Sequence, residues 1–252
     1  MHPLLKFTAR LVPSSLKQQI KDDLVRYFQA PSMELCLKNL RRLGFEPSSI
    51  IDVGAYVGEW SMLAHGIFPQ ASILMIEAQQ SKESKLSAIS RAHPRRIQHR
   101  IALLGPEMRE NVVFHECEAA PTASSVLTSR ESLDFHEVRR RMETLDSVLE
   151  SAGLGKPDFL KLDVQGYELE VLKGAPKTLA TAEVILLEVS TLEMYEGAPL
   201  FHSVIAFMHD HAFRVFDIPT LMRVHGEDTL VQVDAIFVKE TSPLIASAIK
   251  QL

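Results

Sequence analysis

The stretch "SSIIDVGAYVGEW", residues 48–60, joins a short apolar run to an acid and two glycines. The run is typical of a buried strand, and Gly54 and Gly58 follow it where a strand-to-helix turn is expected. Glycine lets a ligand approach the backbone closely, so this turn, with Ala55 and Tyr56 inside it, is predicted to bind a cofactor. Its G-x-x-x-G spacing is not the G-x-G-x-x-G of a dinucleotide site, and it lacks the Lys and Ser/Thr of a phosphate loop. The turn therefore predicts a ligand site without a pyrophosphate receptor.

Strands and helices alternate from residue 50 onward. Strands are expected at 49–53, 72–78, 97–103, 158–164, 183–190, 214–219 and 232–239, with helices between most of them. The apolar runs "SILMI" and "VILLEV" do not alternate with polar residues, so helices should cover both faces of a mostly parallel sheet. The predicted fold is α/β, a doubly wound sheet.

The predicted organisation has one main domain. It spans 46–252 and carries an irregular insertion at about 105–157. An N-terminal helical segment, 1–45, should pack on the core; it contains one amphipathic pattern at 14–28 and a second helix that Ser32 caps and Gly44 ends.

Composition limits the classes of partner. The chain has 252 residues, a net charge of −5 and two cysteines, Cys36 and Cys117, without C-x-x-C spacing. A negative charge disfavours nucleic acid as a partner, and the cysteines fit a reducing, cytoplasmic location. No run reaches the roughly 18 apolar residues of a membrane span. We expect a small-molecule partner; the oligomeric state is not predicted.

A metal site is not predicted. The best candidate cluster is "HDH", residues 209–211, but side chains two apart on a helix do not share a face.

Two acids are expected at neighbouring strand ends. Asp52 ends the first strand and Glu77, followed by Ala78, ends the second. A carboxylate at Glu77 can accept hydrogen bonds from both hydroxyls of a ribose. Asp52 would repel a diphosphate but suits a cationic or hydroxylated ligand. Ribose without pyrophosphate describes S-adenosylmethionine better than a nicotinamide dinucleotide.

The string "DFLKLDVQGYELEVLKGA", residues 158–175, carries a family resemblance. Together with "IIDVGAYVGEWS", "METLDSVL" and "VILLEVS", it resembles the FkbM family of S-adenosylmethionine-dependent methyltransferases over about residues 50–190. The resemblance implies a seven-stranded Rossmann-like sheet with an antiparallel last strand. It also implies methyl transfer, most often to an oxygen acceptor such as a sugar or polyketide hydroxyl. Two residues depart from the pattern: Tyr56 stands where the family has Asn, and Gln165 where it has Glu.

The chemistry of methyl transfer to a hydroxyl suggests catalytic residues. Such an acceptor needs a base, and Asp163, at the end of the fourth strand beside the cofactor, is the candidate. Lys161 lies two residues earlier on the same face of the strand, where it pairs with an acid or orients the acceptor. A structural Lys161–Asp163 pair is the alternative interpretation. Glu188 interrupts an apolar strand, which is costly unless it is partnered or faces a cleft.

Further cofactor contacts are expected in two places. Ala102 and Leu103 end the third strand, where they can flank an adenine. Ser125, with Ser124, lies in "APTASSVL" and resembles a serine-containing loop of the family. Two alternative functions stay open: a nicotinamide-dependent oxidoreductase, and a non-catalytic binding module on a degenerate methyltransferase fold.

Overall fold

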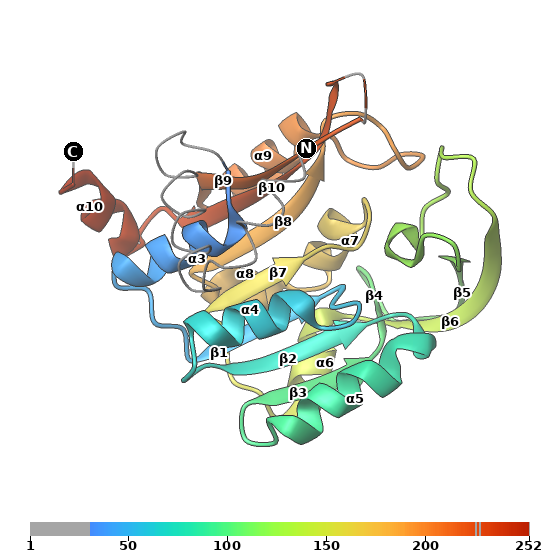
Figure 1. The fold of residues 1–252 in the computed structure, drawn as a ribbon, viewed down its shortest axis with the longest axis horizontal. Coiled ribbons are helices and arrows are strands. Elements are labelled where there is room, and N and C mark those ends of the chain that lie inside the picture. The colour runs from blue at the N-terminus through green and yellow to red at the C-terminus, as the bar shows by residue number, and fades with distance from the viewer. Residues whose placement is uncertain (1–30, 225, 227, 252) are drawn as a thin grey trace, which may run out of the picture.

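A seven-stranded sheet forms the centre of the computed structural model, which describes residues 31–224, 226 and 228–251 (Figure 1). Its strands are β1 (Ser49–Val53), β2 (Ser72–Glu77), β3 (Ile97–Ile101), β7 (Phe159–Leu162), β8 (Val184–Ser190), β9 (Phe213–Arg223) and β10 (Leu230–Lys239). Their order across the sheet is β3-β2-β1-β7-β8-β10-β9. The pairs among β3, β2, β1, β7 and β8 are parallel, whereas β10 lies antiparallel between β8 and β9. The predicted sheet, with its antiparallel last strand, is confirmed.

Helices cover both faces of this sheet. On one face are α3 (Met33–Arg42), α4 (Glu59–Ile67), α5 (Glu83–Ala92) and α10 (Pro243–Ile249). On the other are α6 (Leu145–Ala152), α7 (Glu168–Lys173), α8 (Pro176–Thr181) and α9 (Phe201–Asp210). Successive side chains of a strand point to opposite faces, so Ile50 packs with the first group and Ile51 with the second. Every residue of β1 is buried, which explains why its apolar run does not alternate with polar residues.

Local sequence signals set several helix ends. The Ser32 hydroxyl accepts a hydrogen bond from the Leu35 N–H at 3.4 Å, so α3 begins where its cap was predicted. Cys36, Leu37 and Leu40 of α3 pack into the core. The helix expected at 14–28 lies outside the described residues.

The sequence analysis does not predict helices α8 and α10. Each has proline in its first turn, Pro176 and Pro243, where the missing N–H has no helical partner to lose. The helix that precedes α8, α7, stops before Gly174.

The insertion is more regular than the sequence predicts. It contains β5 (Arg109–Cys117) and β6 (Phe135–Glu143), an antiparallel pair that joins β4 (Leu103–Leu104) in the order β4-β6-β5. The strongly charged "EVRRRM" hides the alternation in which Val138 and Met142 turn inward toward Phe114. The insertion also contains a short 3-10 turn, η2 (Pro121–Ala123). Another, η1 (Gln80–Lys82), precedes α5. The division of the chain into an N-terminal segment and a main domain stays a prediction.

The strand order reverses between β1 and β7. From β1 the chain passes outward to β2 and β3, and from β7 it passes the other way to β8. In open α/β sheets, ligands bind beyond the carboxyl ends of the strands at such a reversal. We therefore expect a ligand site at the segments that follow β1, β2 and β7. Among the described residues, no helix has the length and apolar character needed to cross a membrane.

Candidate active site

A cavity lies beyond the carboxyl ends of β1, β2 and β7, with a volume of about 620 Å³ that includes its opening to solvent. The predicted site residues that line it are Gly54, Tyr56, Glu77, Ala78, Ala102 and Asp163. Residues from the insertion, among them Phe114, Ser124 and Val126, complete the wall. The cavity thus lies where the strand order reverses.

The glycine turn is built by close packing of the chain. Gly54 has a φ of +74°, and a Cβ added to it would lie 1.8 Å from the carbonyl oxygen of Asp163. Gly58 has a φ of +85°, and its Cβ would lie 2.5 Å from Cδ1 of Ile89. The sequence analysis attributed both glycines to the approach of a ligand. The structure gives a different cause, because the space beside each glycine is already taken by the protein itself.

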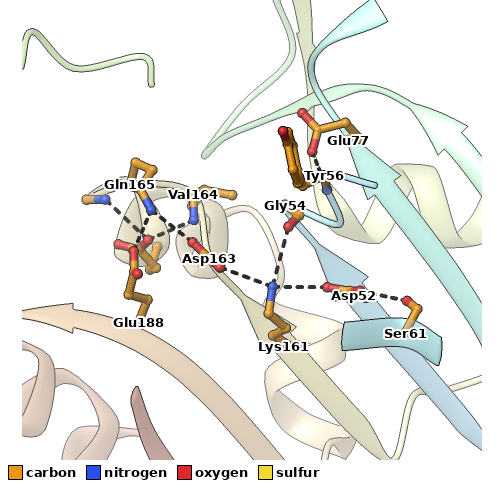
Figure 2. Close-up of polar contacts among 12 residues, drawn as sticks. Asp52, Gly54, Tyr56, Ser61, Glu77, Lys161, Asp163, Val164, Gln165 and Glu188 are labelled. Carbon is orange, nitrogen blue, oxygen red and sulfur yellow. Dashed lines mark hydrogen bonds and ion pairs between the residues drawn. The ribbon is translucent and has the colours of Figure 1, made fainter. Parts of the chain in front are cut away.

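Tyr56 and Glu77 form one side of the cavity (Figure 2). The Tyr56 N–H donates to Oε2 of Glu77 at 2.7 Å, and the Gln79 N–H donates to Oε1 at 2.9 Å. Burial raises the pKa of Glu77, while these backbone donors oppose that rise. The Tyr56 ring has Lys82 Nζ 4.7 Å from its centroid. A carboxylate oriented in this way can still accept hydrogen bonds from ligand hydroxyls, because each oxygen has a further lone pair.

Asp52 and Lys161 form a buried ion pair beneath the cavity (Figure 2). They are register partners on adjacent parallel strands, and Lys161 Nζ lies 3.1 Å from Oδ1 of Asp52. Asp52 also accepts a hydrogen bond from Ser61 Oγ at 2.6 Å, and its side chain is fully buried. The structure does not bring Asp52 to the cavity, although the sequence predicts a cofactor contact there. Asp52 lies within β1 and not past its end. Its side chain points under α4, where Ser61 lies.

Lys161 also reaches the end of β7. Its ammonium lies 3.4 Å from Oδ2 of Asp163 and donates to the Gly54 carbonyl oxygen at 3.4 Å. Burial alone would lower the pKa of Lys161, but the carboxylates of Asp52 and Asp163 outweigh it and raise that pKa above its ordinary value. Lys161 therefore stays charged. Its side chain is 9% exposed, against 35% for Asp163, so Asp163 is the member of this group that faces the cavity.

Gln165 connects Asp163 to Glu188. Its Nε2 donates to Oδ1 of Asp163 at 3.0 Å and to Oε2 of Glu188 at 2.6 Å, as Figure 2 shows. Its Oε1 accepts a hydrogen bond from the Tyr195 hydroxyl at 2.8 Å. Burial, followed by the nearby Asp163, raises the pKa of Glu188 well above its ordinary value. The predicted catalytic residues Asp163, Lys161 and Glu188 thus belong to one polar network.

Glu168 closes the turn that follows Asp163. Its Oε1 accepts hydrogen bonds from the N–H groups of Val164 at 2.9 Å and Gly166 at 3.2 Å. Burial raises the pKa of Glu168 to about 7, although these donors oppose the rise. The carboxylate holds the backbone that presents Asp163 and Gln165.

The remaining predicted cofactor contacts lie behind the cavity wall. Ala55, Gly58 and Ser125 are buried and do not line it. Ser125 Oγ instead donates to the Gln165 carbonyl oxygen at 2.8 Å, and it accepts from the Leu127 N–H at 3.1 Å. Its neighbour Ser124 does reach the cavity.

The sequence analysis missed Tyr195 and Ser61 and left Gln165 without a role. Gln165 carried a usable signal in the sequence, because it follows Asp163 by two positions and directly precedes Gly166. Tyr195 follows β8 in an irregular stretch and has no pattern to mark it. Within the described ranges, no three His, Cys, Asp or Glu side chains are grouped as a metal site.

The family described as "Methyltransferase FkbM domain" matches residues 52–215. Hexuronic acid methyltransferase AglP of Haloferax volcanii is 41% identical over 44 residues, and the match spans 18% of this chain and 18% of that protein.

Solved structures that are similar to this chain include methyltransferases. Methyltransferase FkbM from Methylobacillus flagellatus KT is 14% identical, with a TM-score of 0.49 over 75% of this chain and 43% of that one. The N-terminal domain of EvdMO1, solved in the presence of SAH and D-fucose, is 15% identical, with a TM-score of 0.45 over 82% of each chain. The assignment to a family rests on the match over residues 52–215.

Proposed function

Because the chain belongs to the FkbM methyltransferase family, we propose that it transfers a methyl group from S-adenosylmethionine to a hydroxyl of a small molecule such as a sugar or polyketide. The observation that carries this proposal is the partly exposed carboxylate of Asp163 in the cavity wall, supported from below by a buried Lys161. Family membership favours this proposal over the nicotinamide alternative.

One side of the cavity suits the nucleoside of the cofactor. Glu77 offers a carboxylate to ribose hydroxyls, and its two backbone partners keep it in a fixed orientation. Ala78 and Ala102 add small apolar surfaces beside it, which suit the flat face of a purine. S-adenosylmethionine would supply an electrophilic methyl group. The lining residues fit that cofactor, because S-adenosylmethionine has no diphosphate and the glycine turn offers no receptor for one.

Asp163 is suited to remove the proton of an acceptor hydroxyl. Its Oδ1 accepts from Gln165 and its Oδ2 lies beside Lys161, so both oxygens are oriented while the carboxylate stays partly exposed. A positioned base of this kind typically contributes about 10²–10⁴-fold in rate. Lys161 and Glu188 do not line the cavity, so we assign them to the orientation of Asp163.

The charges around Asp163 favour a neutral acceptor. The Lys161 ammonium is shared between Asp52 and Asp163, and Glu188 adds another acid to the same network. An acceptor carboxylate would meet like charge here. The AglP relative is described as a hexuronic acid methyltransferase, so we expect this chain to differ from it in acceptor. A cytoplasmic location and the absence of a nucleic-acid partner stay predictions.

The substitution Asp163→Asn tests the role of the base. Asn keeps the size of the side chain but is a far poorer base, so transfer of labelled methyl groups to a panel of neutral sugars and polyketide alcohols should fall by about 10²–10⁴-fold. Lys161 would keep its buried partner Asp52, so S-adenosylhomocysteine should bind within about threefold of the parent. Undiminished transfer by the Asn variant would remove Asp163 from the mechanism. Transfer by the parent to amines but not to hydroxyls would overturn the assignment to oxygen.

A further inference from the structure

The amide nitrogen of Gln165 lies between two acidic side chains of the site. We propose that this amide takes the place of a cation between Asp163 and Glu188, and so positions Asp163 without a bound metal ion. The catalytic consequence for Asp163 rests on the proposed function. The charge arrangement itself is independent of it.

Hydrogen bonding fixes the orientation of the amide. Both N–H groups of Nε2 are used, one on Asp163 at 3.0 Å and one on Glu188 at 2.6 Å. Oε1 accepts from the Tyr195 hydroxyl, which also lies 3.1 Å from the Ala123 carbonyl oxygen. A flipped amide would point its oxygen at two acids, so the observed orientation is the one that gives both acids a donor.

The backbone of Gln165 is held as firmly as its side chain. Its φ is +56°, a conformation that is uncommon for residues other than glycine. Ser125 Oγ of the insertion donates to its carbonyl oxygen at 2.8 Å. Gln165 therefore joins four segments: the end of β7, the strand β8, the insertion, and the loop that carries Tyr195. A residue fixed in this way can set the separation of the two acids on either side of it.

The charge balance shows what the amide replaces. Lys161 forms ion pairs with Asp52 and Asp163, whereas Glu188 acts on its ammonium only through its charge at longer range. In the part of the chain that the structure describes, no Lys, Arg or His forms an ion pair with Glu188.

The other charged groups that act on Glu188 add to this negative field. They are Glu168 of α7 and Asp234 of β10, which is the register partner of Glu188. Two close acids in such surroundings ordinarily take up a proton or pair with a cation. The two N–H donors of Gln165 supply that positive partner without a net charge.

Gln165→Glu is the variant that tests this arrangement. It keeps the length of the side chain but replaces the donors with a third carboxylate, which suits oxygen-binding divalent metals. In EDTA the variant should melt below the parent. With Mn²⁺ as the probe, at about 100 times its dissociation constant, the melting temperature of the variant should rise by about 5–10 °C. The parent should show no such rise.

Three further variants make the test specific. Gln98→Glu adds the same charge at an exposed position of β3 and should not gain a response to Mn²⁺. Asp163→Asn added to Gln165→Glu should abolish the response. The exchanged pair Gln165→Glu/Glu188→Gln restores one amide among two acids, so it should melt near the parent in EDTA and ignore Mn²⁺.

Each possible result decides the proposal. A parent whose melting temperature rises with Mn²⁺, with the rise lost in Asp163→Asn, would overturn it, because a cation would already bind there. A Gln165→Glu variant that is as stable as the parent in EDTA, or that ignores Mn²⁺, would also overturn it. If Gln165→Glu does not fold, the exchanged pair decides: a folded protein supports the proposal, and a second failure refutes it. None of these melts needs cofactor or acceptor, so their failure is separate from that of the proposed function.

Discussion

At the scale of single residues, the site depends on how one lysine is divided between two acids. Lys161 lies 3.1 Å from the buried Asp52 and 3.4 Å from the more exposed Asp163. A buried carboxylate that loses its cation is strongly destabilising, because its desolvation is no longer compensated. Asp52 is therefore the structural partner of Lys161, and Asp163 is the partner that can work on a ligand.

Lys161→Met measures this division. It leaves Asp52 buried without its ammonium and should lower the free energy of unfolding by about 3–5 kcal/mol in urea. Adding Asp52→Asn should recover part of the loss, because the uncompensated charge is gone. Lys177→Met is the control, since the Lys177–Glu150 pair is mostly exposed and should contribute little. A Lys161→Met variant as stable as the control would contradict the account.

At the scale of elements, the junction of β1 with β7 explains the glycine turn. The Gly54 and Ala55 N–H groups donate to the Ile76 carbonyl oxygen at 2.9 and 3.0 Å, which ties the turn to β2. On its other side the turn touches the backbone of Asp163. The turn thus fixes the distance between the strands that carry the two sides of the site.

Gly54→Ala should therefore act on stability before it acts on binding. The positive φ and the contact with Asp163 should together lower the free energy of unfolding by about 2 kcal/mol or more. Gly66→Ala is the matched control. Gly66 lies in α4, and an added Cβ there meets no atom within 4 Å. That change should stabilise the protein by about 0.5–1 kcal/mol. Equal stability of the Gly54→Ala variant and the parent would show that the turn can accommodate a Cβ atom, and would contradict this prediction.

Glu168, in the first turn of α7, should make the stability of the folded protein depend on pH. The pKa of Glu168 in the folded protein, about 7, lies above that of an unfolded glutamate, so ionised Glu168 destabilises the fold. This cost is absent below about pH 4.5, grows as the pH rises, and is complete above about pH 7. The substitution Glu168→Gln introduces an amide that carries no charge and whose oxygen could still accept both backbone hydrogen bonds.

Urea denaturation of Glu168→Gln and the parent at pH 5, 6.5 and 8 checks this dependence. The stability of the variant relative to the parent should increase across that range by on the order of 2–3 kcal/mol. A difference that stays constant with pH would mean that Glu168 is ionised without cost.

At the scale of the whole molecule, the sequence predicts the sheet better than the chemistry of its edge. Unbroken apolar runs and the family motifs indicate the strands and their antiparallel end. They do not show on which side of a strand end a side chain lies. Asp52 is followed by another strand residue and points under α4, whereas Asp163 lies just past β7 and faces the cavity. Tyr195 reaches Gln165 from 30 positions away, through a loop without periodicity.

The central claim is that the cavity beyond β1 and β2 binds S-adenosylmethionine through Glu77. Calorimetric titration of the purified chain with S-adenosylhomocysteine and with NADH tests it most directly. We predict one bound S-adenosylhomocysteine per chain, no binding of NADH, and a loss of about 1.5–3 kcal/mol in Glu77→Gln. Glu46→Gln, an exposed change at the opposite end of the sheet, should bind like the parent. A parent that does not bind S-adenosylhomocysteine, or a Glu77→Gln variant that binds it unchanged, would contradict the account.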